Sequence, residues 1–166
     1  MGRWENCLLH CVKEACEGFV KTRITEGENL KKDLLHKLDH MEELVGFIEE
    51  RSPKIVSEYR KKLEDKMAEV LADTSIDESR IAAEVILYAD KICVDEETVR
   101  LRSHITHARQ CLSEDGGIGR KLDFIAQEMN REANTTLSKA NDIEISNAAI
   151  DLKTEIEKVK IGRAHV

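Results

Sequence analysis

Apolar residues recur at spacings of three and four along most of this chain, and this spacing constrains the fold more than any other feature. It gathers the apolar side chains of a helix on one face, which can then be buried against other helices. Only one proline and eight glycines occur among the 166 residues, and aromatic residues make up 4% of them, so the alternating runs of a sheet protein are not expected. The sequence therefore predicts an all-α chain. The longest apolar series is Leu30, Leu34, Leu38, Met41, Val45 and Ile48.

Turn signals divide the chain into helices. A first helix is expected over residues 5–50, with a candidate break near Gly27. Ser52 and Pro53 are typical of an N-cap and of a first helical position, so a second helix is expected over residues 53–71. A connection this short predicts a long antiparallel helical hairpin. A bundle of about four further helices follows, with predicted starts near Glu78, Asp95, Gly119 and Asp142.

Charge and cysteine usage narrow the classes of function. The net charge of −7 argues against general binding of nucleic acids, although residues 100–109 (RLRSHITHAR) hold three arginines and two histidines without an acid. That segment predicts either a solvated helix face or a local anion site. The five cysteines form no Cys-x-x-Cys pair, and neither a secretory signal nor an apolar run of membrane length is present. A cytoplasmic protein with reduced thiols and no membrane contact is expected.

Residues 119–140 (GRKLDFIAQEMNREANTTLSKA) combine a helical apolar stripe with many residues that are poor helix formers. Asn, Thr and Ser side chains compete for backbone hydrogen bonds and weaken a helix. Local rules of this kind tend to be broken at functional sites. We therefore expect this helix to carry a functional polar face. Its polar members are Asn130, Asn134, Thr135, Thr136 and Ser138.

The motifs of this chain resemble the C-terminal half of the YicC-like family of bacterial endoribonucleases. The most specific motif lies in residues 119–139, and Glu-Glu-x-x-Arg-Leu-x-x-His and Arg-x-x-Glu-Gly-x-x-Leu elements lie upstream, over residues 96–104 and 23–30. Residues 1–160 are thus identified as a YicC-like C-terminal helical domain without the N-terminal β-containing domain of the family. The motif positions are Arg23, Glu26, Gly27, Leu30, Glu96, Glu97, Arg100, Leu101, His104, Gly119, Arg120, Leu122, Asp123, Phe124, Gln127, Glu128, Asn130, Arg131, Glu132, Asn134, Thr135, Ser138 and Lys139.

The resemblance implies a metal-dependent endoribonuclease that acts on single-stranded or small RNA and forms a ring-shaped homo-oligomer. Carboxylates would hold Mg²⁺ or Mn²⁺ as the divalent cation, and a histidine would move a proton near neutral pH. The candidate metal ligands are Glu97, Asp123, Glu128 and Glu132, and these residues together with His104 are the candidate catalytic residues. The candidate RNA contacts are Arg100, Arg120, Lys121, Asn130, Arg131, Asn134, Ser138 and Lys139.

The same residues fit other interpretations. The carboxylates could form structural ion pairs with Arg100, Arg120 and Arg131, and His104 could be a hydrogen-bonded structural residue. Two other functions also stay open. One is an RNA-binding adaptor that presents RNA to another nuclease, and the other is a helical oligomerisation module without catalysis of its own.

The last six residues, IGRAHV, break the pattern of the helix before them. They back-translate to ATC GGA AGA GCA CAC GTC, which resembles a common sequencing adapter that continues into a stop codon. We therefore expect residues 161–166 to be a non-biological tail.

Overall fold

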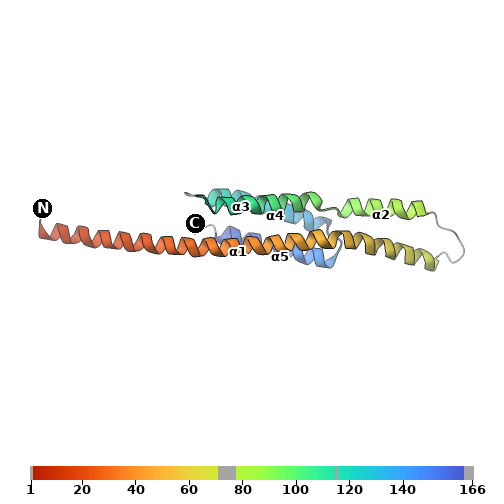
Figure 1. Cartoon of the computed structure of the whole chain (residues 1–166), viewed down its shortest axis with the longest axis horizontal. Helices are drawn as coiled ribbons and strands as arrows, with labels where there is room; N and C mark the ends of the chain where they lie inside the picture. Colours follow the sequence, from red (N-terminus) through yellow and green to blue (C-terminus); the bar gives the residue numbers. More distant parts are fainter. Residues whose placement is uncertain (1, 71–77, 115, 163–166) are drawn as a thin grey trace.

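The computed structural model describes residues 2–70, 78–114 and 116–162, and every helix or strand within those ranges is an α-helix. The all-α class predicted from the apolar spacing is confirmed. Figure 1 shows one very long helix with shorter helices gathered along part of it. Across the described ranges, no helix combines the length and the apolarity needed to cross a membrane. The helices are α1 (Arg3–Val70), α2 (Glu78–Ile92), α3 (Asp95–Cys111), α4 (Gly119–Lys139) and α5 (Ile143–Gly162).

α1 is a single helix of 68 residues, so the turn predicted at residues 51–53 is wrong. Pro53 lies inside the helix, and the Ser52 hydroxyl donates to the Ile48 carbonyl at 2.7 Å instead of capping a new helix. The apolar stripe explains this continuity, because Ile48 is fully buried before the proline and Ile55 is buried after it. Burial along that stripe outweighs a proline in a helix interior, which costs about 3 kcal/mol.

α2 runs back, antiparallel, along the second half of α1 (Figure 1). Tyr59 of α1 stacks on Tyr88 of α2 with the ring centroids 3.7 Å apart. The predicted break at Gly27 is also wrong, because α1 passes through it. The hairpin predicted within residues 5–71 is a single helix, and the prediction of about four further helices after it is confirmed by α2 to α5.

The main core lies where α3 and α5 pack against the middle of α1 and α4 packs against both of them. By contrast, no described side chain of α1 before Leu30 is buried, and this part of the helix extends beyond the bundle (Figure 1). The core is therefore centred on the region that also holds the predicted site. Its fully buried side chains include Leu34, Leu38, Met41, Val45, Leu101, Ile105, Leu122, Met129, Leu152 and Ile156.

Asp142 caps the start of α5, as the sequence predicts. Its Oδ1 accepts from the backbone N–H groups of Glu144 and Ile145 at 3.0 and 3.1 Å, and its Oδ2 accepts from Arg51 Nη2 of α1 at 2.9 Å. Burial opposes ionisation of Asp142, but the Arg51 and backbone hydrogen bonds outweigh it and lower the pKa of this carboxyl. This cluster joins α1 to the start of α5.

The predicted tail lies partly inside the described residues. Ile161 and Gly162 are the last residues of α5, while residues 163–166 lie outside the described ranges.

Candidate functional site

The interface between α3 and α4 holds several of the charged residues predicted as a site. The two helices run antiparallel, because Glu97 near the start of α3 contacts Lys139 at the end of α4. Lys139 Nζ donates to Glu97 Oε1 at 2.8 Å and to the Cys93 carbonyl at 3.0 Å. The hydrogen bond to Glu97 raises the pKa of Lys139. Glu97 is buried, and its Oε2 has no hydrogen-bond partner among the described residues.

A second ion pair crosses the same interface. Arg100 Nη1 of α3 lies 3.4 Å from Glu132 Oε1 of α4, and Arg100 Nη2 also contacts Glu96. The Glu132 side chain is 6% exposed whereas that of Arg100 is 51% exposed, so a surface cation reaches in to neutralise a buried acid. This contact fits the structural ion-pair interpretation of Glu132.

His104 and Glu128 lie at one level of the interface. The register set by the two ion pairs places His104 of α3 opposite Glu128 of α4, and both side chains are half-buried. Neither side chain makes a hydrogen bond or ion pair within the part of the chain that the structure describes. Among the candidate catalytic residues, His104 and Glu128 are therefore the two whose polar atoms are available to a substrate.

The four carboxylates predicted as metal ligands do not gather into one group. Glu97 and Glu132 are each paired with a cation, and Asp123 Oδ2 accepts a hydrogen bond from Gln127 at 3.1 Å. Across residues 2–70, 78–114 and 116–162, no three His, Cys, Asp or Glu side chains could hold one metal ion. These residues alone thus do not fit the divalent-metal centre that the resemblance implies.

The predicted RNA contacts divide between two surfaces. Arg100 and Lys139 belong to the α3–α4 interface, and Asn130 is half-buried. The other five are exposed along α4 and form what we call the outer face. Its members are Arg120, Lys121, Arg131, Asn134 and Ser138.

Three of the poor helix formers of α4 are accommodated by hydrogen bonds within the helix. Thr135 Oγ1 donates to the Arg131 carbonyl at 3.2 Å, and Thr136 Oγ1 donates to the Glu132 carbonyl at 2.9 Å. Ser138 Oγ donates to the Thr135 carbonyl at 2.8 Å. Their hydroxyls therefore bond to carbonyls of the same helix instead of breaking it, and α4 extends over 21 residues.

A groove at the start of α4 contains two residues that the sequence did not single out as candidate contacts. Phe124 is 65% exposed beside His107, which projects from α3. The signal that could have found Phe124 is its position four residues after Arg120, which places it on the polar side of the helix. We call this groove, which has a volume of about 390 Å³, the Phe124 groove. It is lined by His107, Arg120, Lys121, Phe124 and Ile125.

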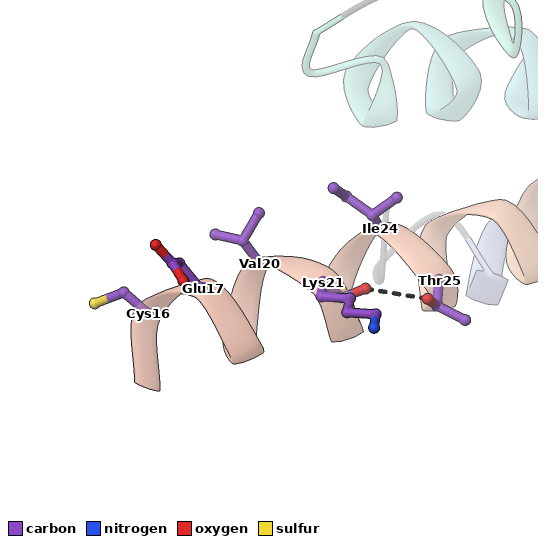
Figure 2. A pocket seen from close by; sticks show the side chains of 6 residues that line it. All are labelled: Cys16, Glu17, Val20, Lys21, Ile24 and Thr25. Carbon is purple, nitrogen blue, oxygen red and sulfur yellow. Dashed lines mark hydrogen bonds between the residues drawn. The ribbon is translucent and has the colours of Figure 1, made fainter. Parts of the chain in front are cut away.

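The N-terminal part of α1 presents a different surface. Figure 2 shows the side chains of Cys16, Val20 and Ile24 spread along one helix, with Thr25 Oγ1 donating to the Lys21 carbonyl at 3.1 Å. The lining comes from α1 alone, so this shallow surface encloses no substrate. Large apolar side chains along it are more than half exposed, namely Trp4, Leu8, Leu9, Val12, Phe19, Val20 and Ile24.

Comparison with known proteins identifies the chain's relatives. The model of the family described as "Endoribonuclease YicC-like, C-terminal" matches residues 48–162. A protein of Clostridioides difficile (strain 630) named "Probable endoribonuclease YicC" is 42% identical over 154 residues, which cover 92% of this chain and 53% of that protein. A protein of the same name from Haemophilus influenzae (strain ATCC 51907 / DSM 11121 / KW20 / Rd) is 33% identical over 153 residues, with the same coverage. The chain therefore spans about half the length of the curated relatives it matches.

Proposed function

Because the chain belongs to the YicC-like endoribonuclease family, we propose that it is part of an enzyme that cleaves phosphodiester bonds of single-stranded or small RNA. The relatives, named probable endoribonucleases, support the reaction class. The unengaged pair of His104 and Glu128, beside the cationic outer face of α4, is the observation that carries the proposal to particular residues. The bacterial cytoplasm is the compartment we propose, since all five cysteines are free thiols.

The chemistry we propose for this pair is general acid–base catalysis. Cleavage of a phosphodiester requires one group to take the proton of the attacking oxygen and another to protonate the leaving oxygen. Glu128 is suited to the first task and His104 to the second, and the register of α3 and α4 places them at one level. Arg131, on the outer face three residues after Glu128, is the cation we propose to bind the phosphate.

Dependence on Mg²⁺ or Mn²⁺ is a separate proposal. Among the candidate ligands, Glu97 and Glu132 are held by Lys139 and Arg100, so no step above is assigned to a metal. We propose that any divalent-cation centre of the longer relatives draws ligands from outside this chain. Cleavage by a full-length relative that EDTA abolishes, together with no Mn²⁺ binding by this chain alone, would support that proposal. Mn²⁺ binding by this chain that Glu97→Gln removes would contradict it.

The test is a gel assay with an unstructured RNA carrying a 5′ fluorophore. We expect cleavage by this chain or by the full-length Clostridioides difficile relative, and a rate lowered about 10²- to 10⁴-fold by removing Glu128 or His104. Glu128→Gln and His104→Ala are the test variants, and Glu28→Gln, on the exposed part of α1, is the matched control. Full cleavage by Glu128→Gln contradicts the catalytic assignment, and RNA retention without cleavage by either protein favours the adaptor function.

The exposed apolar side chains of α1 favour a second proposal, assembly into a homo-oligomer. Seven large apolar residues from Trp4 to Ile24 are each more than half exposed, and that much apolar surface in water usually marks an interaction surface. Light scattering should give a mass above one chain that falls in Phe19→Asp. A monomer in both samples would contradict assembly through this part of α1.

A further inference from the structure

We propose that the Phe124 groove is a nucleobase-stacking subsite for single-stranded RNA, in which the Phe124 ring stacks on a base and Arg120 binds the neighbouring phosphate. The inference rests on the proposed function, which says that this chain acts on RNA, and it adds the place and the means of contact. Its observations are an exposed aromatic ring, two cations of α4 and a histidine of α3 around one groove.

The packing of the bundle turns position 124 outward but does not require an aromatic side chain there. Ile125, the next residue, is buried in the core and fixes the rotation of α4, so Phe124 points away from that core with 65% of its surface exposed. Aromatic residues are only 4% of this chain, and a single exposed apolar residue is ordinary on a protein surface. A ring at the rim of a cationic groove is different, because an aromatic face with adjacent cations is the usual platform for a single-stranded base.

The charges in the groove favour an anionic occupant. Within the described residues, no carboxylate lies within salt-bridge distance of the Arg120 guanidinium. Lys121 is paired with Glu114, which compensates its charge, so Arg120 is the cation of the groove left to bind an anion. His107 adds a third nitrogen-bearing group from the facing helix. Phosphate contacts of this kind position a nucleic acid without reading its sequence.

The groove continues into the outer face of α4. Arg120 lies four residues before Phe124 and Arg131 lies seven residues after it, and these spacings place all three on one side of the helix. At a rise of about 1.5 Å per residue, the two arginines lie about 16 Å apart along the axis with the ring between them. That arrangement suits an extended strand that crosses several helical turns, with a base held near one end.

The test measures binding of a fluorescein-labelled oligoadenylate to the full chain at low salt. Phe124→Ala should weaken binding about 5- to 150-fold, because stacking on an aromatic side chain contributes about 1–3 kcal/mol per base. Phe124→Tyr should restore most of the affinity. Val99→Ala is the matched control, since Val99 is 66% exposed on α3 and does not line the groove, and it should bind like the wild type.

A second readout reports stacking directly. Trp4 is the sole tryptophan of the chain, so Trp4→Phe combined with Phe124→Trp places one fluorophore in the groove. Quenching of its emission by oligoadenylate is expected, with weaker quenching by abasic oligomer of the same length. Arg120→Gln should lower affinity for every sequence and reduce the slope of log affinity against log salt by about one.

The outcomes separate the inference from the proposed function. Absence of RNA binding by the wild-type chain overturns both. Wild-type binding that Phe124→Ala and the tryptophan reporter leave unchanged overturns the stacking subsite alone. A Phe124→Ala variant with unchanged RNA affinity but an altered mass in light scattering makes the groove a protein interface, and that result also overturns the inference.

Discussion

Removal of Lys139 should cost more stability than removal of its partner Glu97. The Glu97 side chain is 6% exposed and that of Lys139 is 35% exposed, so only the acid depends fully on its partner for neutralisation. Lys139→Met leaves a buried carboxylate without a counter-charge, and such a loss costs about 3–5 kcal/mol for a fully buried pair. Because Lys139 is one-third exposed, we take the lower end and expect about 3 kcal/mol.

Glu97→Gln should be milder. Glutamine keeps an oxygen that accepts from Lys139 Nζ, and the lysine can turn toward water, so the expected cost is about 1 kcal/mol. The double variant should then be more stable than Lys139→Met alone, since no buried charge is left. For a chain of this length, the difference of about 2 kcal/mol between the single variants corresponds to about 4–8 °C in Tm.

The assay is urea unfolding followed by circular dichroism at the helical band. Lys62→Met is the control, because Lys62 is exposed on α1, and its effect should stay within about 0.5 kcal/mol. Two results would contradict this prediction: Lys139→Met costs no more than Glu97→Gln, or the double variant is as unstable as Lys139→Met. Either result would mean that Glu97 is not held as a buried anion by Lys139.

The remaining predictions concern the bundle and α1. Leu38→Ala, at a fully buried site, should lower the free energy of unfolding in urea by about 2–5 kcal/mol. Leu8→Ala, on the exposed part of α1, should lower it by less than about 0.5 kcal/mol. Equal losses in the two variants would contradict a core centred on the middle of α1. Pro53→Ala should stabilise the chain by about 1–2 kcal/mol, because it supplies the missing N–H inside α1, and a fall in Tm would show that the proline is needed there. Asp142→Asn keeps a capping oxygen but removes the charge. Because the pKa of Asp142 is lowered in the folded chain, ionised Asp142 stabilises the fold above about pH 4, and this stabilisation is lost as the pH falls through the folded pKa. The wild type and this variant should therefore differ in stability at pH 7 and converge in acid. A constant difference over that range would contradict an ionic role.

The helices were predictable from local patterns, and the error at residues 51–53 shows where local patterns fail. Ser52 and Pro53 form a correct helix-start signal, but Ile48 and Ile55 are buried on one continuous stripe. Which of the two wins depends on later helices, because Ile48 and Ile55 are buried in one cluster with residues of α2 and α5. A local pattern contains no information about those helices. Asp142, whose cap needs only the next three residues, was predicted correctly.

The candidate site was predictable in its residue types but not in its pairings. Glu97 and Lys139 lie 42 residues apart, so their contact depends on the register of α3 against α4. The same register separates the predicted carboxylates into paired acids and the unengaged Glu128. Phe124 was part of a recognised motif, yet only the rotation of α4, fixed by buried neighbours such as Ile125, reveals that its ring is exposed.

Photo-crosslinking with a 4-thiouridine-substituted RNA, followed by mass spectrometry of the joined peptides, tests most directly whether α3 and α4 carry the RNA-binding surface. We expect crosslinks within α4, concentrated between Arg120 and Arg131, and on the facing residues of α3 around His104 and His107. Crosslinks confined to α1 or α5, or none from an RNA that the chain demonstrably retains, would contradict this expectation.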